Sequence, residues 1–315
     1  MKRYLFTISL CAILLIPACH TPGRLSGVNH LNKDHQEKAF HFFIFGDWGR
    51  RGSFDQKQVA NQMRIQARKF NPAFILSMGD NFYEDGVTSI TDTHWKESYN
   101  DIYKELTGID WYVTLGNHDY RGSVQAEIDY HSVNPHWNMP DRYYTTVINS
   151  ADGQKIRLIC IDTSPYYKDY YTNPKMTAVK TQDTAAQRRW LETTLANAKE
   201  PWKFVFGHHP AYSAALRGGT PDLLAMLKPL MDKYHVQAYI CGHDHNLQHN
   251  RPTGSYTDYF VSGAGSEVKD GNTFNPALFA ASTPGFGDIT LQHDSLYLNF
   301  INENGKIIYH YARSK

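Results

Sequence analysis

Two histidines stand one residue apart in the stretch Cys-Gly-His-Asp-His, directly after an apolar-rich run that ends at Ile240. Successive side chains alternate in an extended loop, so His243 and His245 would point the same way. A shared metal ion would offset the cost of burying two imidazoles, because imidazole nitrogen is a good ligand for zinc and iron. A surface loop can also carry histidines that bind nothing, so the interpretation depends on the other loops of the chain.

The same arrangement occurs five times: an apolar run stops, a glycine follows, and a potential metal ligand comes next. The five places are Gly46-Asp47, Gly79-Asp80 with Tyr83, Gly116-Asn117 with His118, Gly207-His208, and Gly242-His243 with His245. Glycine lets the backbone turn sharply and approach a ligand closely, and open α/β sheets bind ligands beyond the carboxyl ends of their strands. A single Gly-Asp pair is a common turn, but the five together predict one metal site.

The elements that must position these loops alternate between strands and helices. Apolar runs at 40–45, 73–78, 111–115, 155–162, 202–206 and 237–241 are typical of buried strands, and periodic patterns at 54–70, 93–106, 183–199 and 220–234 indicate helices. In the first helix we expect Val59, Met63, Ile65 and Phe70 to be buried. Further strand-like runs and an Asn304-Gly305 hairpin signal lie between 256 and 309. The alternation favours an α/β fold class with added antiparallel strands.

The composition is that of a folded protein without a nucleic-acid partner. Of 315 residues, 41% are hydrophobic and 20% are charged, which is typical of globular proteins. The formal net charge is +1, without a long run of Lys or Arg, whereas proteins that follow nucleic-acid phosphates concentrate positive charge. We therefore expect no nucleic-acid specificity.

The first 18 residues resemble an export signal. Lys2 and Arg3 precede an apolar run over 5–16 that is too short to span a bilayer. The run ends in Ile-Pro-Ala-Cys, similar to a bacterial lipoprotein signal, so Cys19 would become a lipidated membrane tether. An ordinary secretory peptide cleaved nearby is the alternative. We expect a signal peptide at 1–18, a polar linker at 19–38 and one folded domain at 39–315, in the periplasm or on the cell surface.

Two cysteines, Cys160 and Cys241, fall within the expected domain. Both stand in apolar, strand-like contexts, which favours buried free thiols. A disulfide between them is also compatible with the sequence.

Taken in order, the five blocks resemble the motifs of the metallophosphoesterase superfamily. They are Gly-Asp-Trp-Gly at 46–49, Gly-Asp-Asn-Phe-Tyr at 79–83, Gly-Asn-His-Asp at 116–119, Val-Phe-Gly-His-His at 205–209 and Gly-His-Asp-His at 242–245. Trp48 after Asp47, and Tyr83 three residues after Asp80, are similar to the purple acid phosphatases, especially the small tartrate-resistant type. The resemblance covers most of residues 40–265. It implies a four-layer sandwich of two mixed β-sheets flanked by helices.

The resemblance also implies two metal sites joined by a shared aspartate. Carried over residue by residue, Asp47, Asp80, Tyr83 and His245 would hold one ion, and Asp80, Asn117, His208 and His243 the other. Carboxylate and phenolate oxygens suit a hard trivalent ion, while His-rich sites suit softer divalent ions. The expected cofactor is a dinuclear centre of ferric iron plus a divalent ion (iron, zinc or manganese). A ferric ion would keep the Tyr83 phenol ionised, which implies a purple colour.

The resemblance further implies an acid phosphatase, a phosphoric monoester hydrolase in which metal-bound hydroxide attacks a small phosphate ester. His118 is the expected phosphate contact and leaving-group acid, or otherwise a residue that orients a ligand. Arg217 stands where the animal tartrate-resistant enzymes have a second histidine, and it could grip phosphate bidentately. Asp119 and Asp244 could orient neighbouring ligands, and the Tyr-rich run 165–171 could border the pocket or be a plain surface loop.

Two other functions are compatible with these residues. A phosphodiesterase would use the same pair of metals with a different pocket shape. A surface lipoprotein that binds phosphorylated ligands without turnover is disfavoured, because every expected ligand type is present.

Overall fold

The computed structural model describes residues 39–150, 153–269 and 277–315. The expected signal peptide and linker, residues 1–38, lie outside these described residues. Within the described part of the chain, no helix combines the length and the apolar character needed to cross a bilayer.

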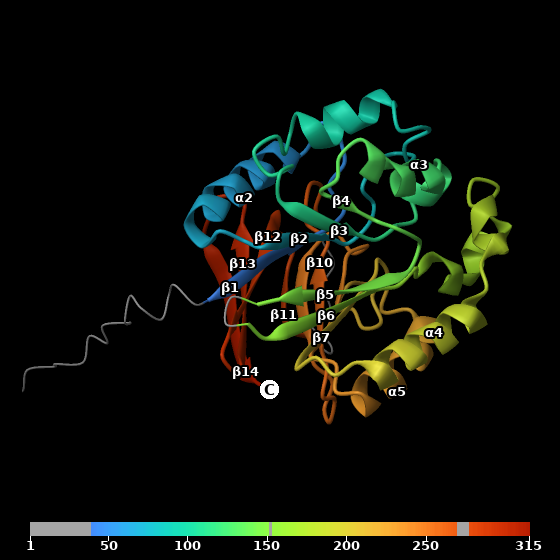
Figure 1. Cartoon of the computed structure of the whole chain (residues 1–315). Helices are drawn as coiled ribbons and strands as arrows, with labels where there is room; N and C mark the ends of the chain where they lie inside the picture. The colour runs from blue at the N-terminus through green and yellow to red at the C-terminus, as the bar shows by residue number, and fades with distance from the viewer. Residues whose placement is uncertain (1–38, 151–152, 270–276) are drawn as a thin grey trace, which may run out of the picture. The chain divides into compact units, whose positions relative to one another are not determined.

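The described strands form two seven-stranded sheets (Figure 1). The first has the order β14-β13-β12-β1-β2-β3-β4, with β1 (Phe40–Phe45), β2 (Phe74–Ser77), β3 (Asp110–Val113), β4 (Trp137–Asn138), β12 (Gly285–Gln292), β13 (Ser295–Asn302) and β14 (Ile307–Ser314). The second has the order β11-β9-β10-β8-β7-β6-β5, with β5 (Tyr144–Asn149), β6 (Lys155–Cys160), β7 (Trp202–Phe206), β8 (Ala238–Cys241), β9 (Leu247–Asn250), β10 (Asp258–Ser262) and β11 (Ala277–Ala281).

Both sheets are mixed. Strands β1, β2, β3 and β4 run parallel, with Phe43 beside Ile75, and β6, β7, β8 and β10 do the same in the second sheet. The outer strands pair antiparallel. Because parallel strands place their carboxyl ends at one edge of a sheet, the loops after them can meet there. The α/β prediction with two mixed sheets is confirmed.

Helices lie outside the sheets. They are α2 (Gln56–Phe70), α3 (Val124–Asp129), α4 (Thr184–Asn197) and α5 (Pro221–Lys233), with shorter turns η1 (Trp95–Asn100), η2 (Asp119–Arg121), η3 (Tyr130–Ser132), η4 (Ser164–Tyr166), η5 (Lys168–Thr172) and η6 (Thr177–Thr181). Helices α4 and α5 lie side by side against the second sheet (Figure 1), and α2 packs on the first. The layers are therefore helix, sheet, sheet, helix.

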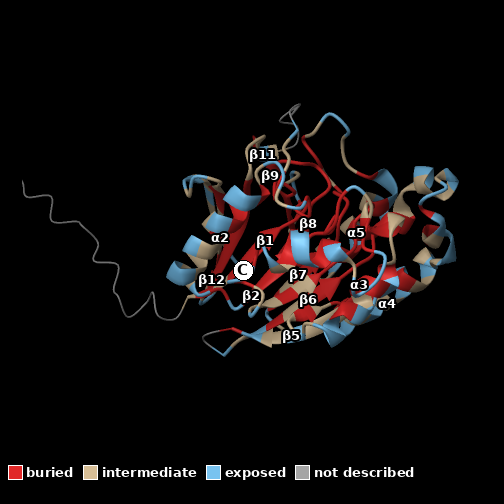
Figure 2. Ribbon diagram, turned by 90° about the horizontal axis from the view of Figure 1, so that it is seen from above, coloured by how far each residue is buried: buried red, intermediate tan, exposed pale blue. Residues whose placement is uncertain are grey.

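Two apolar cores hold these layers together. Between the sheets, Phe42 packs edge-on against Phe204, with ring centroids 5.4 Å apart. Outside the second sheet, Leu191 of α4 and Leu227 of α5 pack against Val205. Figure 2 shows the buried strands in the centre and exposed residues along the outer faces of α2 and α4. Each fully buried side chain of this size stabilises the fold by about 1.5–3 kcal/mol.

Helix α2 differs from its expected pattern at one residue. Val59 and Met63 are fully buried and Phe70 packs at the edge of the core. The prediction for Ile65 is wrong, because its side chain is 42% exposed. Ile65 follows Met63 by two residues, which turns it about 200° around the helix and away from the sheet.

Three other local predictions concern the helix over 93–106, the Asn304-Gly305 turn and the two cysteines. The helix expected over 93–106 is confirmed only over 93–100, which includes η1 (Trp95–Asn100), and turns follow it. The Asn304-Gly305 signal does mark the turn between β13 and β14. Cys160 and Cys241 are free and buried, so the free-thiol interpretation is confirmed and the disulfide alternative is wrong.

Candidate metal centre

Loops that follow five parallel strands meet between the two sheets. Asp47 follows β1, Asp80 follows β2, Asn117 follows β3, His208 follows β7, and His243 and His245 follow β8. Loops from the two sheets contact each other directly: the His243 N–H donates to Asp47 Oδ2 at 2.9 Å. His208 Nδ1 lies 2.8 Å from the carbonyl oxygen of Met78, which directs its Nε2 towards the other loops.

The backbone is strained at three of these positions. Asp47, Asp80 and His243 have φ angles of 60°, 49° and 67°, in the left-handed region that non-glycine residues rarely adopt. Such conformations cost about 1–3 kcal/mol each and cluster at functional sites. The approach of the loops is also close: a Cβ on Gly242 would lie 2.4 Å from Asp47 Oδ2. Only glycine allows this approach.

Tyr83 lies at the centre of a first cluster of potential ligand atoms. Its hydroxyl oxygen is 3.0 Å from Asp47 Oδ1, 2.9 Å from Asp80 Oδ2 and 3.1 Å from His245 Nε2. A hydroxyl carries one hydrogen, so it cannot donate to both carboxylates at once. Oxygen and nitrogen ligands that converge in this way are suited to a cation.

His208 lies at the centre of a second cluster. Its Nε2 is 3.5 Å from Asp80 Oδ1, 3.3 Å from Asn117 Oδ1 and 3.2 Å from His243 Nδ1. Hydrogen bonds alone favour the Asn117 amide with its nitrogen towards His243, whereas a ligand role needs the oxygen there. Asp80 presents Oδ2 to the first cluster and Oδ1 to the second, which is the arrangement of a bridging carboxylate.

The charges of the two clusters fit cations. Burial, the largest influence, raises the pKa of the Asp47 carboxyl to about 8 and holds the pKa of the Tyr83 phenol well above its usual value. Burial also opposes ionisation of Asp80, but His208 and His118 together lower the pKa of that carboxyl. Burial disfavours charge on His208, yet Asp80 and Asp47 raise its pKa to about 9. Buried carboxyl, phenol and imidazole groups of this kind would be stabilised by metal ions.

His209 lies beside the second cluster, and its ring forms with those of His208 and His243 a group whose ligand atoms are within 4.8 Å of one another. Its Nδ1 is 2.8 Å from the Thr163 hydroxyl, and its Nε2 is 2.9 Å from the Tyr170 hydroxyl. Both ring nitrogens are therefore engaged, and His209 supports Tyr170 as part of the pocket wall.

A cavity of about 240 Å³ opens on both clusters. It is lined by Asp80, Asn117, His118, Arg121, Tyr170, Arg217, His243, His245 and Lys269. The Tyr-rich run 165–171 thus borders the pocket through Tyr170. Arg121 and Lys269 add to the residues expected from sequence. Arg121 follows the Gly-Asn-His-Asp block by two residues, so its position in the sequence could have indicated it. Lys269 is distant from every block, and its backbone is held at the site because its N–H donates to the His245 carbonyl at 3.0 Å.

His118 and Arg217 both line this cavity, but their side chains contact different residues. His118 Nδ1 lies 2.5 Å from the Glu84 carbonyl oxygen, and its Nε2 lies 3.9 Å from Asp80 Oδ2. Burial lowers the pKa of the His118 imidazole. Arg217 Nη1 lies 2.5 Å from His243 Nε2, on the outer side of that ring.

Asp119 and Asp244 connect loops. Asp119 accepts hydrogen bonds from the backbone N–H groups of Gly116 at 2.8 Å and Phe82 at 3.1 Å, so it joins the loops after β3 and β2. Asp244 accepts a hydrogen bond from the Ser213 hydroxyl, which ties the loop before Arg217 to the loop after β8.

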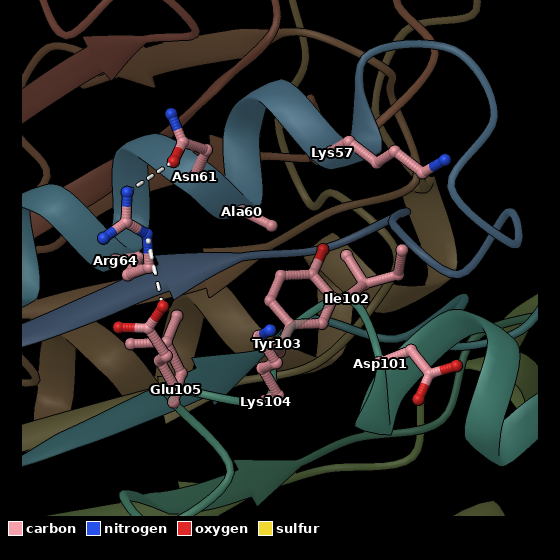
Figure 3. A pocket seen from close by; sticks show the side chains of 10 residues that line it. Lys57, Ala60, Asn61, Arg64, Asp101, Ile102, Tyr103, Lys104 and Glu105 are labelled. Carbon is pink, nitrogen blue, oxygen red and sulfur yellow. Dashed lines mark hydrogen bonds and ion pairs between the residues drawn. The ribbon is translucent and has the colours of Figure 1, made fainter.

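A second hollow, of about 250 Å³, lies between α2 and residues 101–106 (Figure 3). Within it, Arg64 pairs with Glu105 at 3.7 Å and donates to the Asn61 side chain at 2.7 Å. Among the described residues, the groups of His, Cys, Asp and Glu that could hold a metal ion lie elsewhere, in the loops after the strands. The potential metal ligands therefore lie in those loops and not around this hollow.

Comparison with known proteins gives consistent matches. The family model described as calcineurin-like phosphoesterase matches residues 40–247. Purple acid phosphatase 17 of Arabidopsis thaliana is 34% identical over 290 residues, which cover 87% of this chain and 84% of that protein. Tartrate-resistant acid phosphatase type 5 of Homo sapiens is 30% identical over 327 residues, which cover 95% of each.

Among solved structures, GAP50, described as the anchor in the inner membrane complex of Plasmodium, has a similar fold. Its TM-score is 0.76 at 25% identity, and the match covers 88% of this chain and 89% of that one. The two-sheet architecture is thus shared across most of both chains.

Proposed function

The chain belongs to the calcineurin-like phosphoesterase family and, within it, to the purple acid phosphatases, and on this premise we propose which of its residues carry the reaction. It is an acid phosphatase, a phosphoric monoester hydrolase that acts on a phosphate ester. The family uses a dinuclear centre of iron and a divalent metal, and the buried aspartates and histidines of this chain fit it.

The two clusters would each hold one ion. The first, for ferric iron, comprises Asp47, Asp80, Tyr83 and His245, and the second, for the divalent ion, comprises Asp80, Asn117, His208 and His243. When bound, the two cations supply Lewis-acid activation of a water molecule and of the phosphoryl oxygens. The observation that carries this assignment is the position of Asp80, with Oδ2 beside Tyr83 and Oδ1 beside His208.

Three cationic side chains bind the phosphoryl group. Arg121, Arg217 and Lys269 line the same cavity as the ligand residues. An arginine can donate two parallel hydrogen bonds to phosphate oxygens, and a lysine contributes a compact positive charge. Together they hold the phosphoryl group with its leaving oxygen towards His118.

His118 supplies the proton for the leaving oxygen. Its Nδ1 contact with the Glu84 carbonyl fixes the ring and directs Nε2 into the cavity. Loss of a general acid costs about 10²–10⁴-fold in rate, and poor leaving groups suffer most. His118→Ala should therefore slow hydrolysis of an alkyl phosphate far more than that of p-nitrophenyl phosphate. Equal losses would show that His118 only binds or orients.

Metal analysis combined with visible spectroscopy tests the centre itself. The iron-loaded protein should hold two metal ions per chain, absorb visible light through charge transfer from phenolate to ferric iron, and release phosphate from a monoester. Tyr83→Phe should lose the absorption band, because the phenolate donor is gone. A wild-type protein that stays colourless and metal-free after loading would contradict the assignment.

Simple substrates separate this reaction from its alternatives. Faster release from p-nitrophenyl phosphate than from bis(p-nitrophenyl) phosphate is expected for a monoesterase. The reverse preference would identify a phosphodiesterase. Phosphate binding without turnover of any ester by the metal-loaded protein would identify a binding protein instead.

We also propose that the protein is exported and tethered to a membrane through lipidated Cys19. The support is the sequence: Lys2 and Arg3, an apolar run over 5–16, then Ala18 and Cys19. Hydrolysis would then occur in the periplasm or at the cell surface. Cys19→Ser should move the protein from the membrane fraction to the soluble fraction. Unchanged membrane association of that variant would contradict the tether.

A further inference from the structure

Arg50 lies against the ring of Tyr83. Its guanidinium carbon is 3.7 Å from the ring centroid, within the range of a cation–π interaction. The Arg50 side chain is buried and forms ion pairs with Glu84 Oε1 at 3.0 Å and Glu267 Oε2 at 2.7 Å. A cation is therefore fixed over the phenol of the first cluster.

Glu267 connects Arg50 to His245. Its Oε2, which pairs with Arg50, also lies 3.6 Å from His245 Nδ1. That nitrogen is buried and has no hydrogen-bond partner within the described residues, whereas His245 Nε2 faces the Tyr83 hydroxyl at 3.1 Å. Metal-binding histidines usually donate their outer N–H to a carboxylate or carbonyl, which fixes the ring. Glu267 is the nearby carboxylate in the right place to accept it.

We propose that Arg50 and Glu267 form a positioning pair for the first cluster, an inference that rests on the proposed metal centre. Arg50 holds the Tyr83 ring and stabilises negative charge on its oxygen. Glu267 holds His245 with Nε2 towards the same point. Neither residue is among those that line the cavity, so the pair acts through the ligands and makes no contact with substrate.

The chain offers a matched control in the neighbouring pair of Arg51 and Glu97. Arg51 Nε lies 2.8 Å from Glu97 Oε2, but both side chains are at the surface, 53% and 46% exposed. Substitution of these residues removes charges of the same kind, in the case of Arg51 from the residue next to Arg50, without touching Tyr83 or His245. Any general effect of charge or handling will appear equally in the control.

The absorption band of the iron-loaded protein reports on Arg50. A cation over the ring lowers the energy of the phenolate electrons, so charge transfer to ferric iron requires more energy. Arg50→Met should move the band to longer wavelength and make the iron harder to reduce. Arg50→Lys keeps the charge but loses the planar guanidinium, so its band should lie between the other two. Arg51→Met should match the wild type.

Iron retention reports on Glu267. Loss of a residue that orients a metal ligand typically weakens metal affinity about 10- to 100-fold. Glu267→Met should therefore release iron to a chelator correspondingly faster, followed as decay of the absorption band. Glu97→Met should release iron at the wild-type rate.

The outcomes separate this pair from the centre on which it depends. Absence of the band from the wild-type protein would overturn the centre and the pair together. A wild-type band that does not move in either Arg50 variant, with unchanged iron retention in Glu267→Met, would overturn the pair alone. Circular dichroism establishes folding of each variant. If Arg50→Met does not fold, the band of Arg50→Lys and the iron retention of Glu267→Met still test the positioning pair.

Discussion

Two buried polar clusters join the two sheets, and their charges are balanced differently. One is the candidate centre around Asp80. The other surrounds Asp258 of β10, where side chains of β14 reach across to the second sheet. His249 Nε2 and Arg313 Nη1 each lie 2.8 Å from an Asp258 oxygen. His249 Nδ1 is 2.9 Å from the Tyr309 hydroxyl, so the other side of the imidazole is also engaged.

The pKa values of the buried carboxyl groups are shifted in opposite directions in the two clusters. Burial opposes ionisation of Asp258, but hydrogen bonds and charges from His249 and Arg313 lower its pKa below the usual value. Burial dominates at Asp47 and raises its pKa to about 8. The Asp258 cluster contains its own positively charged side chains, so its buried carboxylate is balanced within the protein. The cluster around Asp47 and Asp80 is rich in acidic groups and suited to receive cations from outside.

The largest expected effect is that of Asp80→Asn. Loss of the shared carboxylate should remove the divalent ion and weaken iron binding, because one residue serves both clusters. Activity should fall on the order of 10³-fold or more, since the metals supply several kcal/mol of transition-state stabilisation. Metal content and phosphate release measure this. Asp258→Asn is the matched control. Full activity of Asp80→Asn with two bound metals would contradict the proposed difference between the Asp80 and Asp258 clusters.

Asp258→Asn should lower the stability of the protein and leave metal binding and activity unchanged. Removing one partner of a buried ion pair costs about 3–5 kcal/mol, so urea denaturation should show a loss of that order. Metal content and kcat of the folded protein should stay at wild-type levels. Loss of metal without loss of stability would show that the two clusters are not independent.

This stability difference should depend on pH. The Tyr311 hydroxyl lies 3.4 Å from Asp258 Oδ2. Burial opposes ionisation of Asp258, but the groups that face it, His249, Arg313 and Arg251, lower its folded-state pKa. Its contribution is therefore fully present above the unfolded-state pKa of about 3.9 and is lost as the pH falls through the lower folded-state value. Wild type and Asp258→Asn should differ most near neutral pH and converge in strong acid. A constant difference would contradict the sign of this shift.

Iron and zinc should each stabilise the protein by about 2.7 kcal/mol when the free concentration of that ion is 100 times its dissociation constant. Asp258→Asn should respond fully and Asp80→Asn much less. Binding must displace the proton of Asp47, whose pKa is raised to about 8, so loading should release protons and weaken as the pH falls. Thermal melts and a pH indicator in weak buffer measure both. Equal stabilisation of the Asp80→Asn variant would contradict the bridging role.

A smaller effect is expected from Arg121→Met. Hydrogen bonds to charged groups are worth about 1.5–3 kcal/mol, so KM should rise about tenfold or more while metal content is unchanged. Lys168→Met is the control, because Lys168 is 83% exposed, pairs with Asp222 and lies outside the cavity lining. Equal kinetics of the two variants would exclude a phosphate contact for Arg121.

Spacing along the chain predicted the strands and the loops after them, because apolar runs followed by glycine are local signals. It also predicted the residues that the structure brings together around Tyr83 and His208. It missed Lys269, whose backbone is held by the His245 carbonyl, and Arg50, whose role depends on a ring more than thirty positions away. It assigned Ile65 to the wrong face, since an apolar residue in a helix need not lie on the buried side.

Residue type and periodicity are local properties, so the order of residues already specifies which ligand chemistry is available and which strand each ligand follows. The fold is needed to turn one Asp80 oxygen to each cluster and to place Arg50 over the Tyr83 ring. Those relations are distances of a few ångströms between loops of different strands, and they arise when two packed sheets bring the ends of their parallel strands to one place.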